Sequence, residues 1–188
     1  MSHLILVRHS QPEMIQGIPA SQWHLSQEGI RRAGLLGAQL SAYDFHHIIS
    51  STEPKALETA QIIASNLGIT TEIIPGLHEH VRQDVSFSNQ QEFAVAIEQF
   101  FTHPGEIVMG KETADQAYDR FSQAVSVVLN SYPSQDLAIV SHGTVISLFV
   151  SRRCGIPPFE FWQRLGLPGF VTLSLPEMRS VPVLFSVS

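Results

Sequence analysis

The sequence predicts an α/β sandwich built on a parallel sheet, and three apolar stretches carry this prediction. Each stretch is short and ends abruptly in polar residues, which is typical of strands buried on both faces of a parallel sheet. The stretches and their polar ends are 4–7 with Arg8-His9, 48–49 with Ser50-Ser51-Thr52, and 137–140 with Ser141-His142. Because open α/β sheets bind ligands at the carboxyl ends of their strands, we expect these polar residues to share one edge.

Helix signals alternate with the strands in the first half of the chain. Ser26 suits the N-cap of one helix, Pro54 suits the first turn of the next, and Gly68 suits its C-terminal cap. The loop at 11–22 contains two prolines and a glycine, so we expect it to be irregular. The elements predicted after the first strand are helices over 27–41 and 54–67 and a short strand over 71–74.

The second half follows the same alternation after a looser segment. The pattern weakens over 80–110, which we expect to form a small cap insertion in a single domain spanning 1–188. Thr113 and Gln116 have the spacing of a capping box, which predicts the start of a helix. The elements predicted here are helices over 90–101, 113–130 and 144–153 and strands over 170–175 and 181–187.

Composition supports one globular domain and limits its partners. The chain has 188 residues, 44% of them apolar and 15% charged, which is enough to bury a full core. Its net charge of -6 argues against nucleic acid as a partner. The single cysteine, Cys154, allows no intramolecular disulfide and fits a reducing compartment. No apolar run approaches the ~18 residues that cross a bilayer, and the first strand begins too early for a signal peptide. We therefore expect a cytoplasmic protein without membrane contact.

The polar residues at the strand ends suit phosphoryl chemistry. A neutral histidine is a competent nucleophile toward phosphorus, and the cations Arg8 and Lys55 would disfavour the charged form of His9. Arginine also binds phosphoryl oxygens with two parallel hydrogen bonds. The amide of Gly143, at the start of a predicted helix, can bind an anion. Arg8-His9 alone can equally be a polar turn, but His142 at the same edge favours a site.

Four sequence blocks resemble those of the histidine phosphatase superfamily, the phosphoglycerate mutase-like proteins, in the family's order. The blocks are Leu6-Val7-Arg8-His9, Ser50-Ser51 with Lys55-Ala56 and Thr59-Ala60, Leu77-His78-Glu79, and Ser141-His142-Gly143. Gly110-Lys111-Glu112-Thr113 also resembles a family block that precedes a helix. Each block is weak by itself, but four in order are specific. The resemblance implies a three-layer α/β/α sandwich with a mostly parallel central sheet.

The same resemblance implies a phosphohistidine intermediate and gives roles to individual residues. His9 would be the nucleophile, and Arg8 and His142 would bind the phosphoryl oxygens. Glu79 would donate a proton to the leaving oxygen. The resemblance implies no metal and no cofactor. The other residues that we expect to bind the substrate phosphate are Ser10, Lys55 and Gly143.

Four positions depart from the family pattern. Ser10 follows the nucleophile where a glycine is usual, and Pro12 and Ile15 replace a common threonine and asparagine in the next loop. Lys55 stands where the second phosphate-binding arginine falls, and lysine keeps the charge but loses the two-pronged geometry. These departures leave open a weakly active or inactive homologue that binds phosphate in a regulatory role.

Glu79 lies between two histidines, and other interpretations of the region stay open. It can be a solvated loop carboxylate, and His78 with His80 can be a metal pair, although two ligands in a loop make a poor site. The G-x-x-x-x-G-K match over 105–111 is not a P-loop, because Glu112 follows where Ser or Thr should bind Mg²⁺. Four phenylalanines can line an apolar substrate pocket or form the core of the cap: Phe87, Phe93, Phe100 and Phe101.

These observations predict a metal-independent phosphatase that hydrolyses a phosphomonoester in two steps through phospho-His9. The substrate would be a small phosphorylated molecule, with a phosphopeptide as an alternative, and the oligomeric state stays open. A mutase of the phosphoglycerate type is the first alternative function. A mutase must shield its phosphoenzyme from water, however, and the segment between Glu79 and Glu112 is short for such a lid. The second alternative is the phosphate-binding regulatory homologue.

Overall fold

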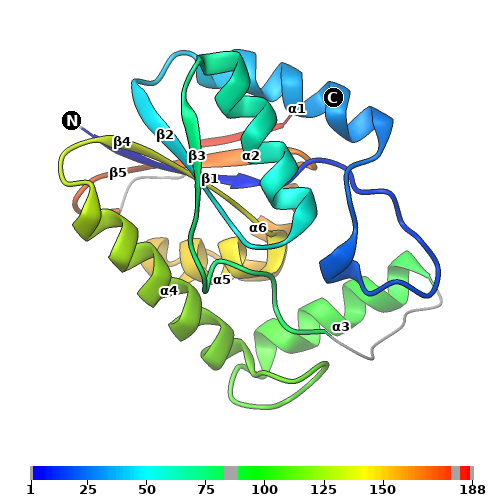
Figure 1. Ribbon diagram of the computed structural model, residues 1–188. Coiled ribbons are helices and arrows are strands. Elements are labelled where there is room, and N and C mark those ends of the chain that lie inside the picture. The colour runs from blue at the N-terminus through cyan, green and yellow to red at the C-terminus, as the bar shows by residue number, and fades with distance from the viewer. Residues whose placement is uncertain (1, 83–88, 179–182, 187–188) are drawn as a thin grey trace.

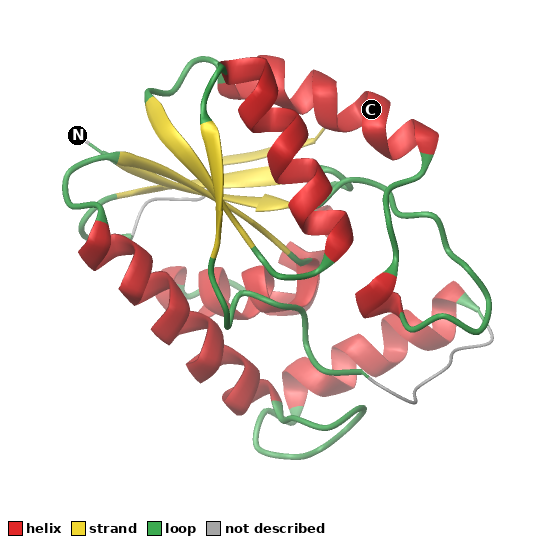
Figure 2. Ribbon diagram, viewed as in Figure 1, coloured by secondary structure: helices red, strands yellow, loops and turns green. Residues whose placement is uncertain are grey.

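In a computed structural model, the chain forms one six-stranded sheet with helices on both faces (Figure 1, Figure 2). The structure describes residues 2–82, 89–178 and 183–186. The strand order is β3-β2-β4-β1-β5-β6. The strands are β1 (His3–Arg8), β2 (Phe45–Ser50), β3 (Thr70–Ile73), β4 (Asp136–Ser141), β5 (Gly169–Ser174) and β6 (Val183–Ser186).

The sheet is mostly parallel, as the apolar stretches predict. Neighbouring strands run parallel from β3 through β2 and β4 to β1, whereas β5 is antiparallel to both of its neighbours, β1 and β6. Residues of β1 alternate between the faces, so Leu4 and Leu6 belong to one hydrophobic cluster and Ile5 and Val7 to the other. All four side chains are fully buried. Burial on both faces explains why β1 has no polar residue over 4–7.

Helices cover both faces and complete three layers. On the Ile5 face, α1 (Gln27–Leu40) and α2 (Pro54–Leu67) pack against each other, and their apolar side chains join those of the strands in the smaller cluster. The larger cluster, on the Leu4 face, includes Phe121 and Phe149. Its helices are α3 (Gln90–Thr102), α4 (Ala114–Ser131), α5 (Gly143–Cys154) and α6 (Pro158–Arg164). The predicted three-layer α/β/α fold is confirmed.

The predicted helix ends are also confirmed where local chemistry sets them. The Ser26 hydroxyl accepts a hydrogen bond from the Gly29 amide at 3.0 Å, and Gly68 ends α2 in the left-handed region with φ of 70°. Thr113 forms the predicted capping box at the start of α4. Two short elements are missing from the sequence predictions, α6 and the 3-10 turn η1 (Ala20–Gln22). Two consecutive prolines at the start of α6 resemble a loop, yet a proline suits the first turn of a helix.

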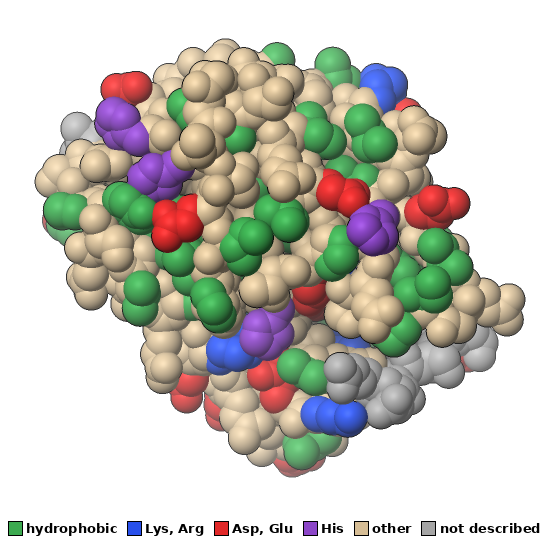
Figure 3. All heavy atoms as spheres, in the orientation of Figure 1, with side chains coloured by type: hydrophobic (Ala, Val, Ile, Leu, Met, Phe, Trp, Pro, Cys, Tyr) green, Lys and Arg blue, Asp and Glu red, His purple; other side chains and the backbone are tan. Residues whose placement is uncertain are grey.

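Residues 80–110, for which the sequence predicts a cap, contain α3. Its buried side chains Ile97, Phe100 and Phe101 join the same cluster as α4 and α5. Phe87 and most of the segment that precedes α3 lie outside the described residues. On the face seen in Figure 3, Lys and Arg side chains lie singly among acidic and apolar ones. No helix in the described part of the chain has the length and apolar character needed to span a bilayer.

Candidate active site

The polar ends of β1, β2 and β4 meet at one edge of the sheet, as predicted. Arg8 and Ser141 are paired in the parallel register of β1 and β4. Just past the strands, the His9 amide donates to the Ser141 carbonyl and the Ser51 amide to the Val140 carbonyl, both at 2.9 Å. The imidazole rings that follow β1 and β4 consequently lie together, with the centroids of His9 and His142 5.1 Å apart.

His9 is held in the form that a nucleophile requires. Its Nδ1 lies 2.7 Å from the Ser10 carbonyl oxygen, and a carbonyl can only accept, so Nδ1 carries the proton. The lone pair therefore lies on Nε2. Burial, assisted by the neighbouring His142 and Lys55, lowers the pKa of His9 well below its usual 6.5. His9 is thus neutral at neutral pH, with Nε2 able to attack an electrophile.

His142 is a second buried and neutral imidazole. Its Nε2 lies 2.8 Å from the Ser51 hydroxyl, while its Nδ1 is buried without a partner among the described residues. Burial and the positive charge of Lys55 lower the pKa of His142 well below 6.5. Buried polar atoms normally form hydrogen bonds, so an unpaired Nδ1 fits a group that binds a phosphoryl oxygen.

Arg8 lies against the N-terminus of α5. Its Nη1 donates to the carbonyl of Leu165, at the end of α6, at 2.8 Å. Its Nε is buried without a partner among the described residues. A Cβ on Gly143 would lie 2.9 Å from that Nε, so only glycine allows the guanidinium to approach so closely. Burial lowers the pKa of Arg8 to about 10, which leaves it a cation at neutral pH.

The carboxylate of Glu79 binds at the same helix N-terminus. It accepts hydrogen bonds from the amides of His80 at 2.9 Å and Thr144 at 3.2 Å, and Arg82 lies 3.6 Å away. Burial alone would raise its pKa, but Arg82 and the two amides outweigh burial and hold the pKa of Glu79 well below its usual range. Glu79 is therefore a carboxylate in the unliganded site. Arg82 was not predicted as part of the site.

Residues of α4 and the segment before it position the loop that carries Glu79. Arg120 donates to the carbonyls of Gly76 at 2.8 Å and His78 at 2.9 Å, and also forms an ion pair with Glu112. Glu112 in turn accepts a hydrogen bond from a backbone amide two residues after Glu79. The block at 110–113 noted in the sequence thus helps to hold the loop that carries Glu79. Arg120 was not predicted to have this role.

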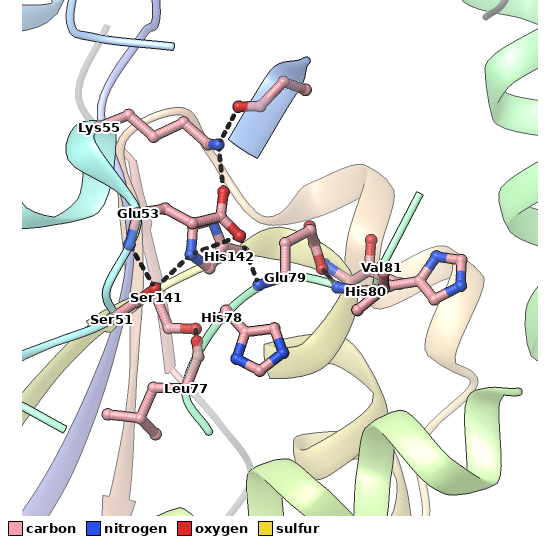
Figure 4. Close-up of polar contacts among 12 residues, drawn as sticks. Ser51, Glu53, Lys55, Leu77, His78, Glu79, His80, Val81, Ser141 and His142 are labelled. Atoms are coloured by element: carbon pink, nitrogen blue, oxygen red, sulfur yellow. Dashed lines mark hydrogen bonds and ion pairs between the residues drawn. The ribbon is translucent and has the colours of Figure 1, made fainter. Parts of the chain in front are cut away.

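Lys55 is buried in an ion pair with Glu53, a residue that the sequence analysis did not single out (Figure 4). The Lys55 ammonium lies 2.5 Å from Glu53 Oε2 and 2.5 Å from the carbonyl of Ala20. Glu53 Oε1 accepts a hydrogen bond from the Glu79 amide at 2.9 Å and lies 3.7 Å from His142 Nε2. The expected phosphate-binding cation is therefore already paired with a carboxylate.

Ser10 uses both of its donors within the protein. Its hydroxyl donates to the Gly29 carbonyl at 2.7 Å, and its amide donates to the Thr59 hydroxyl at 3.0 Å. These bonds tie the end of β1 to α1 and α2. A bond from Ser10 to a substrate phosphate would have to replace one of them, so the geometry favours a structural role.

The two histidines beside Glu79 do not converge. His80 is 2% exposed, its Nε2 lies 3.1 Å from the Glu112 carbonyl oxygen, and its ring packs on Phe100 with centroids 4.1 Å apart. Figure 4 shows the rings of His78 and His80 lying well apart. Among the residues that the structure describes, no three His, Cys, Asp or Glu side chains are grouped so that they could hold a metal ion.

Comparison with known families identifies the family of this chain. A model of the histidine phosphatase superfamily (branch 1) matches residues 4–178. The chain belongs to this superfamily. The match includes both strand ends that carry histidine, the loop of Glu79 and the start of α5.

Relatives within the superfamily carry both phosphatase and mutase names. A probable phosphoglycerate mutase from Erwinia tasmaniensis is 28% identical over 168 residues, covering 84% of this chain and 77% of the relative. The adenosylcobalamin/alpha-ribazole phosphatase of Escherichia coli is 25% identical over 168 residues, covering 85% and 83%. The fold is similar to that of phosphoserine phosphatase from Entamoeba histolytica in complex with 3-phosphoglyceric acid. In that comparison the TM-score is 0.76, and the identity is 23% over 100% of this chain and 98% of the other.

Proposed function

We propose that this protein is a phosphatase that hydrolyses a small phosphomonoester through a phosphohistidine on His9. The observation that carries the proposal is the state of His9, which is neutral, buried and protonated on Nδ1, so that Nε2 is the nucleophile. Arg8 Nε and His142 Nδ1 are buried polar atoms without partners among the described residues. They would bind the phosphoryl oxygens, together with the amides that begin α5.

In the first step, His9 Nε2 attacks phosphorus and the bond to the leaving oxygen breaks. The leaving oxygen takes a proton from Glu79, whose carboxyl group becomes a carboxylate. In the second step, that carboxylate takes a proton from water as the water oxygen attacks phosphorus and the P–N bond breaks. Inorganic phosphate leaves and His9 is restored, and Glu79 passes its proton to the departing phosphate or to water and returns to the carboxylate.

Glu79 must gain a proton before the first step, because it is ionised in the unliganded site. Two features of substrate binding would supply it. A phosphoryl group bound at the start of α5 competes for the Thr144 amide and places negative charge beside Glu79, which raises the pKa of the carboxyl. The substrate also carries a proton when it binds as the monoanion, since the second pKa of a phosphomonoester is about 6.

A phosphate-binding protein with little turnover is the second candidate, and one observation favours it. The Glu53 carboxylate neutralises Lys55, the cation at the position of the second phosphate-binding arginine. With that charge neutralised, the site would stabilise the transition state less. Turnover of p-nitrophenyl phosphate separates the enzyme from the binding protein, and a 3-phosphoglycerate exchange assay separates hydrolysis from mutase activity.

Replacement of His9 tests the phosphatase proposal directly. We expect His9→Ala to abolish turnover of p-nitrophenyl phosphate while the fold survives, and we expect His46→Ala, an exposed control, to retain wild-type rates. Rapid quenching with labelled substrate should trap acid-labile, base-stable phosphate on the wild type and none on His9→Ala. Wild-type rates in His9→Ala would reject the mechanism.

A chelation experiment tests metal independence. The proposed site handles the charge of the phosphoryl group with Arg8, His142 and helix amides, so activity should survive EDTA. Loss of activity in EDTA, with recovery on addition of Zn²⁺ or Mg²⁺, would return His78 and His80 to consideration as metal ligands.

A further inference from the structure

Two partly buried aromatic rings at the edge of the main core lie beside the candidate site. Phe93 on α3 and Trp162 on α6 meet edge to face with ring centroids 5.8 Å apart, and both are only partly buried. Phe159 stacks on Trp162 at 5.9 Å. Phe100 and Phe101, which the sequence analysis grouped with Phe93, differ from it because they are buried in the main core.

Trp162 adjoins the phosphoryl end of the site. The Arg8 guanidinium carbon lies 6.0 Å from the centroid of the Trp162 ring. A Cβ on Gly143 would lie 3.3 Å from Trp162 Nε1. The indole therefore lies next to both the guanidinium and the helix N-terminus that are proposed to hold the phosphoryl group.

Phe93 adjoins the proton-donor end of the site. The Arg82 guanidinium carbon lies 4.9 Å from the centroid of the Phe93 ring, and the same guanidinium lies 3.6 Å from the Glu79 carboxylate. The leaving group must lie on the side of its proton donor. Phe93 and Trp162 together thus extend from the phosphoryl end to the place where the leaving group emerges.

The charges beside the proton donor disfavour an acidic leaving group. Arg82 is paired with Glu79, and Lys55 is paired with Glu53, whose other oxygen binds the Glu79 amide. A carboxylate on the substrate would have to displace Glu79 from Arg82 or Glu53 from Lys55. The other of these two acids would stay in place and repel it. A flat apolar group gains ring contacts and buried area at the same place without that conflict.

We propose that Phe93 and Trp162 are specificity-determining residues that select a phosphomonoester with a planar aromatic leaving group. The inference rests on the proposed phosphatase function and names the substrate class of that site. It predicts that aryl phosphates are preferred over carboxylated substrates such as 3-phosphoglycerate. Among aryl phosphates, it predicts that preference grows with the area of the ring system.

Naphthyl phosphate and phenyl phosphate make a matched pair, because their leaving phenols have similar acidity and differ mainly in ring area. We expect the wild type to favour naphthyl phosphate by about tenfold in kcat/KM, chiefly through KM. Phe93→Ala should reduce this ratio to about one, and Phe93→Tyr should restore it. Val95→Ala, an exposed apolar residue on the same helix, should leave the ratio unchanged.

Trp162→Ala tests the second ring, and Trp162→Phe keeps a ring in place if the alanine variant fails to fold. We expect a reduced ratio in Trp162→Ala and an intermediate one in Trp162→Phe. A wild-type ratio near one, an unchanged ratio in Phe93→Ala, or faster turnover of 3-phosphoglycerate than of naphthyl phosphate would overturn the inference.

Binding to His9→Ala separates this inference from the proposed function, because that variant cannot form the phosphohistidine. Calorimetry should give a lower Kd for naphthyl phosphate than for phenyl phosphate by about tenfold, and Phe93→Ala in the same background should remove the difference. Equal Kd values would reject the aromatic selection even if His9 is the nucleophile. A clear difference in Kd without turnover by the wild type would reject the phosphatase and retain the selection.

Discussion

Glu53 changes what Lys55 can do in the site. The two side chains form an ion pair at 2.5 Å and are 8% and 5% exposed, so water screens their charges poorly. A buried pair adds little net stability compared with apolar residues, but removing one partner leaves an uncompensated charge. The positive charge of Lys55 is therefore neutralised by Glu53 within the site. The Glu53 carboxylate also accepts the hydrogen bond from the Glu79 amide.

We predict that Lys55→Met lowers the free energy of unfolding by about 3–5 kcal/mol, because the Glu53 carboxylate is left buried and unpaired. The double variant Glu53→Gln with Lys55→Met should recover most of that loss. Urea denaturation measures both, with the exposed Arg164→Met as the control. Equal losses in the single and double variants would contradict the pairing. Wild-type kcat/KM in the double variant would show that Lys55 does not contact the phosphate.

We predict that Glu79→Gln slows alkyl phosphates by about 10²–10⁴-fold and p-nitrophenyl phosphate much less. A basic alkoxide needs a proton as it leaves, whereas nitrophenolate leaves without one. Glutamine retains the shape of the side chain and can still contact the Thr144 amide through its carbonyl oxygen. Steady-state kinetics on the two substrates measure the difference, and equal losses on both would reject the role of proton donor.

Single residues were predictable from sequence where a strand end or a known block marks them. His9 and His142 follow apolar strands, so a shared edge follows from a parallel sheet, and the pairing of β1 with β4 then brings the two rings together. Glu53, Arg82 and Arg120 lack such a mark, because their importance comes from burial between segments far apart in the chain. One signal was present for Glu53. It lies two residues before Lys55, and its negative charge can neutralise that lysine.

At the scale of elements, α4 and α6 each support one side of the site from a distance. The Arg120 side chain of α4 binds backbone carbonyls of the loop that carries Glu79, and the end of α6 accepts a hydrogen bond from Arg8. Helix α4 was predictable, since its capping box is a local signal. Helix α6 was not, because its proline-rich start has no N-cap side-chain bond and its seven residues are too few to show a clear helical period.

We predict that Arg120→Met lowers kcat for alkyl phosphates by about 10- to 100-fold while p-nitrophenyl phosphate is affected much less. The variant removes the hydrogen bonds that place the Glu79 loop but leaves His9 and its neighbours intact. Arg31→Met, which removes an exposed arginine of α1, is the matched control. Equal losses on both substrates would point to general damage to the fold rather than to a misplaced proton donor.

At the scale of the whole molecule, the site contains buried histidines and a carboxylate whose pKa values are all lowered. Burial lowers the pKa of His9 and His142, and Arg82 with backbone amides lowers that of Glu79 despite its burial. The sequence could predict that these residues share an edge, since the ends of apolar strands and the caps of helices are local signals. The neighbouring cations already predicted a neutral His9, but burial is the larger cause of its lowered pKa. The ionised state of Glu79 could not be predicted, because it depends on Arg82 and on backbone amides that only the folded chain brings to the carboxylate.

We predict that kcat/KM for alkyl phosphates falls as pH rises above about 6. Glu79 has no proton of its own in the unliganded site, so the productive substrate is the monoanion, whose pKa is about 6. Protonation of the nucleophile does not reduce the rate in mild acid, because the lowered pKa of His9 keeps its imidazole neutral there. A pH–rate profile on an alkyl phosphate measures the effect, and Glu79→Gln should flatten it. A flat wild-type profile between pH 5.5 and 8 would contradict the proton source.

Stability should change with pH in the opposite direction. The pKa values of His9 and His142 are lowered in the folded state, so below pH 6.5 the unfolded chain binds more protons and acid favours unfolding. These two histidines together predict a loss of about 2–3 kcal/mol between pH 7.5 and pH 5.5, measured as the change in the free energy of urea unfolding. His78 and His80, whose pKa values burial also lowers, add to that loss. His142→Gln should reduce the change by about 1–1.5 kcal/mol, whereas His46→Ala should retain it. A free energy of unfolding that is equal at the two pH values would show that these imidazoles are not buried in the neutral form, and the nucleophile would then need another explanation.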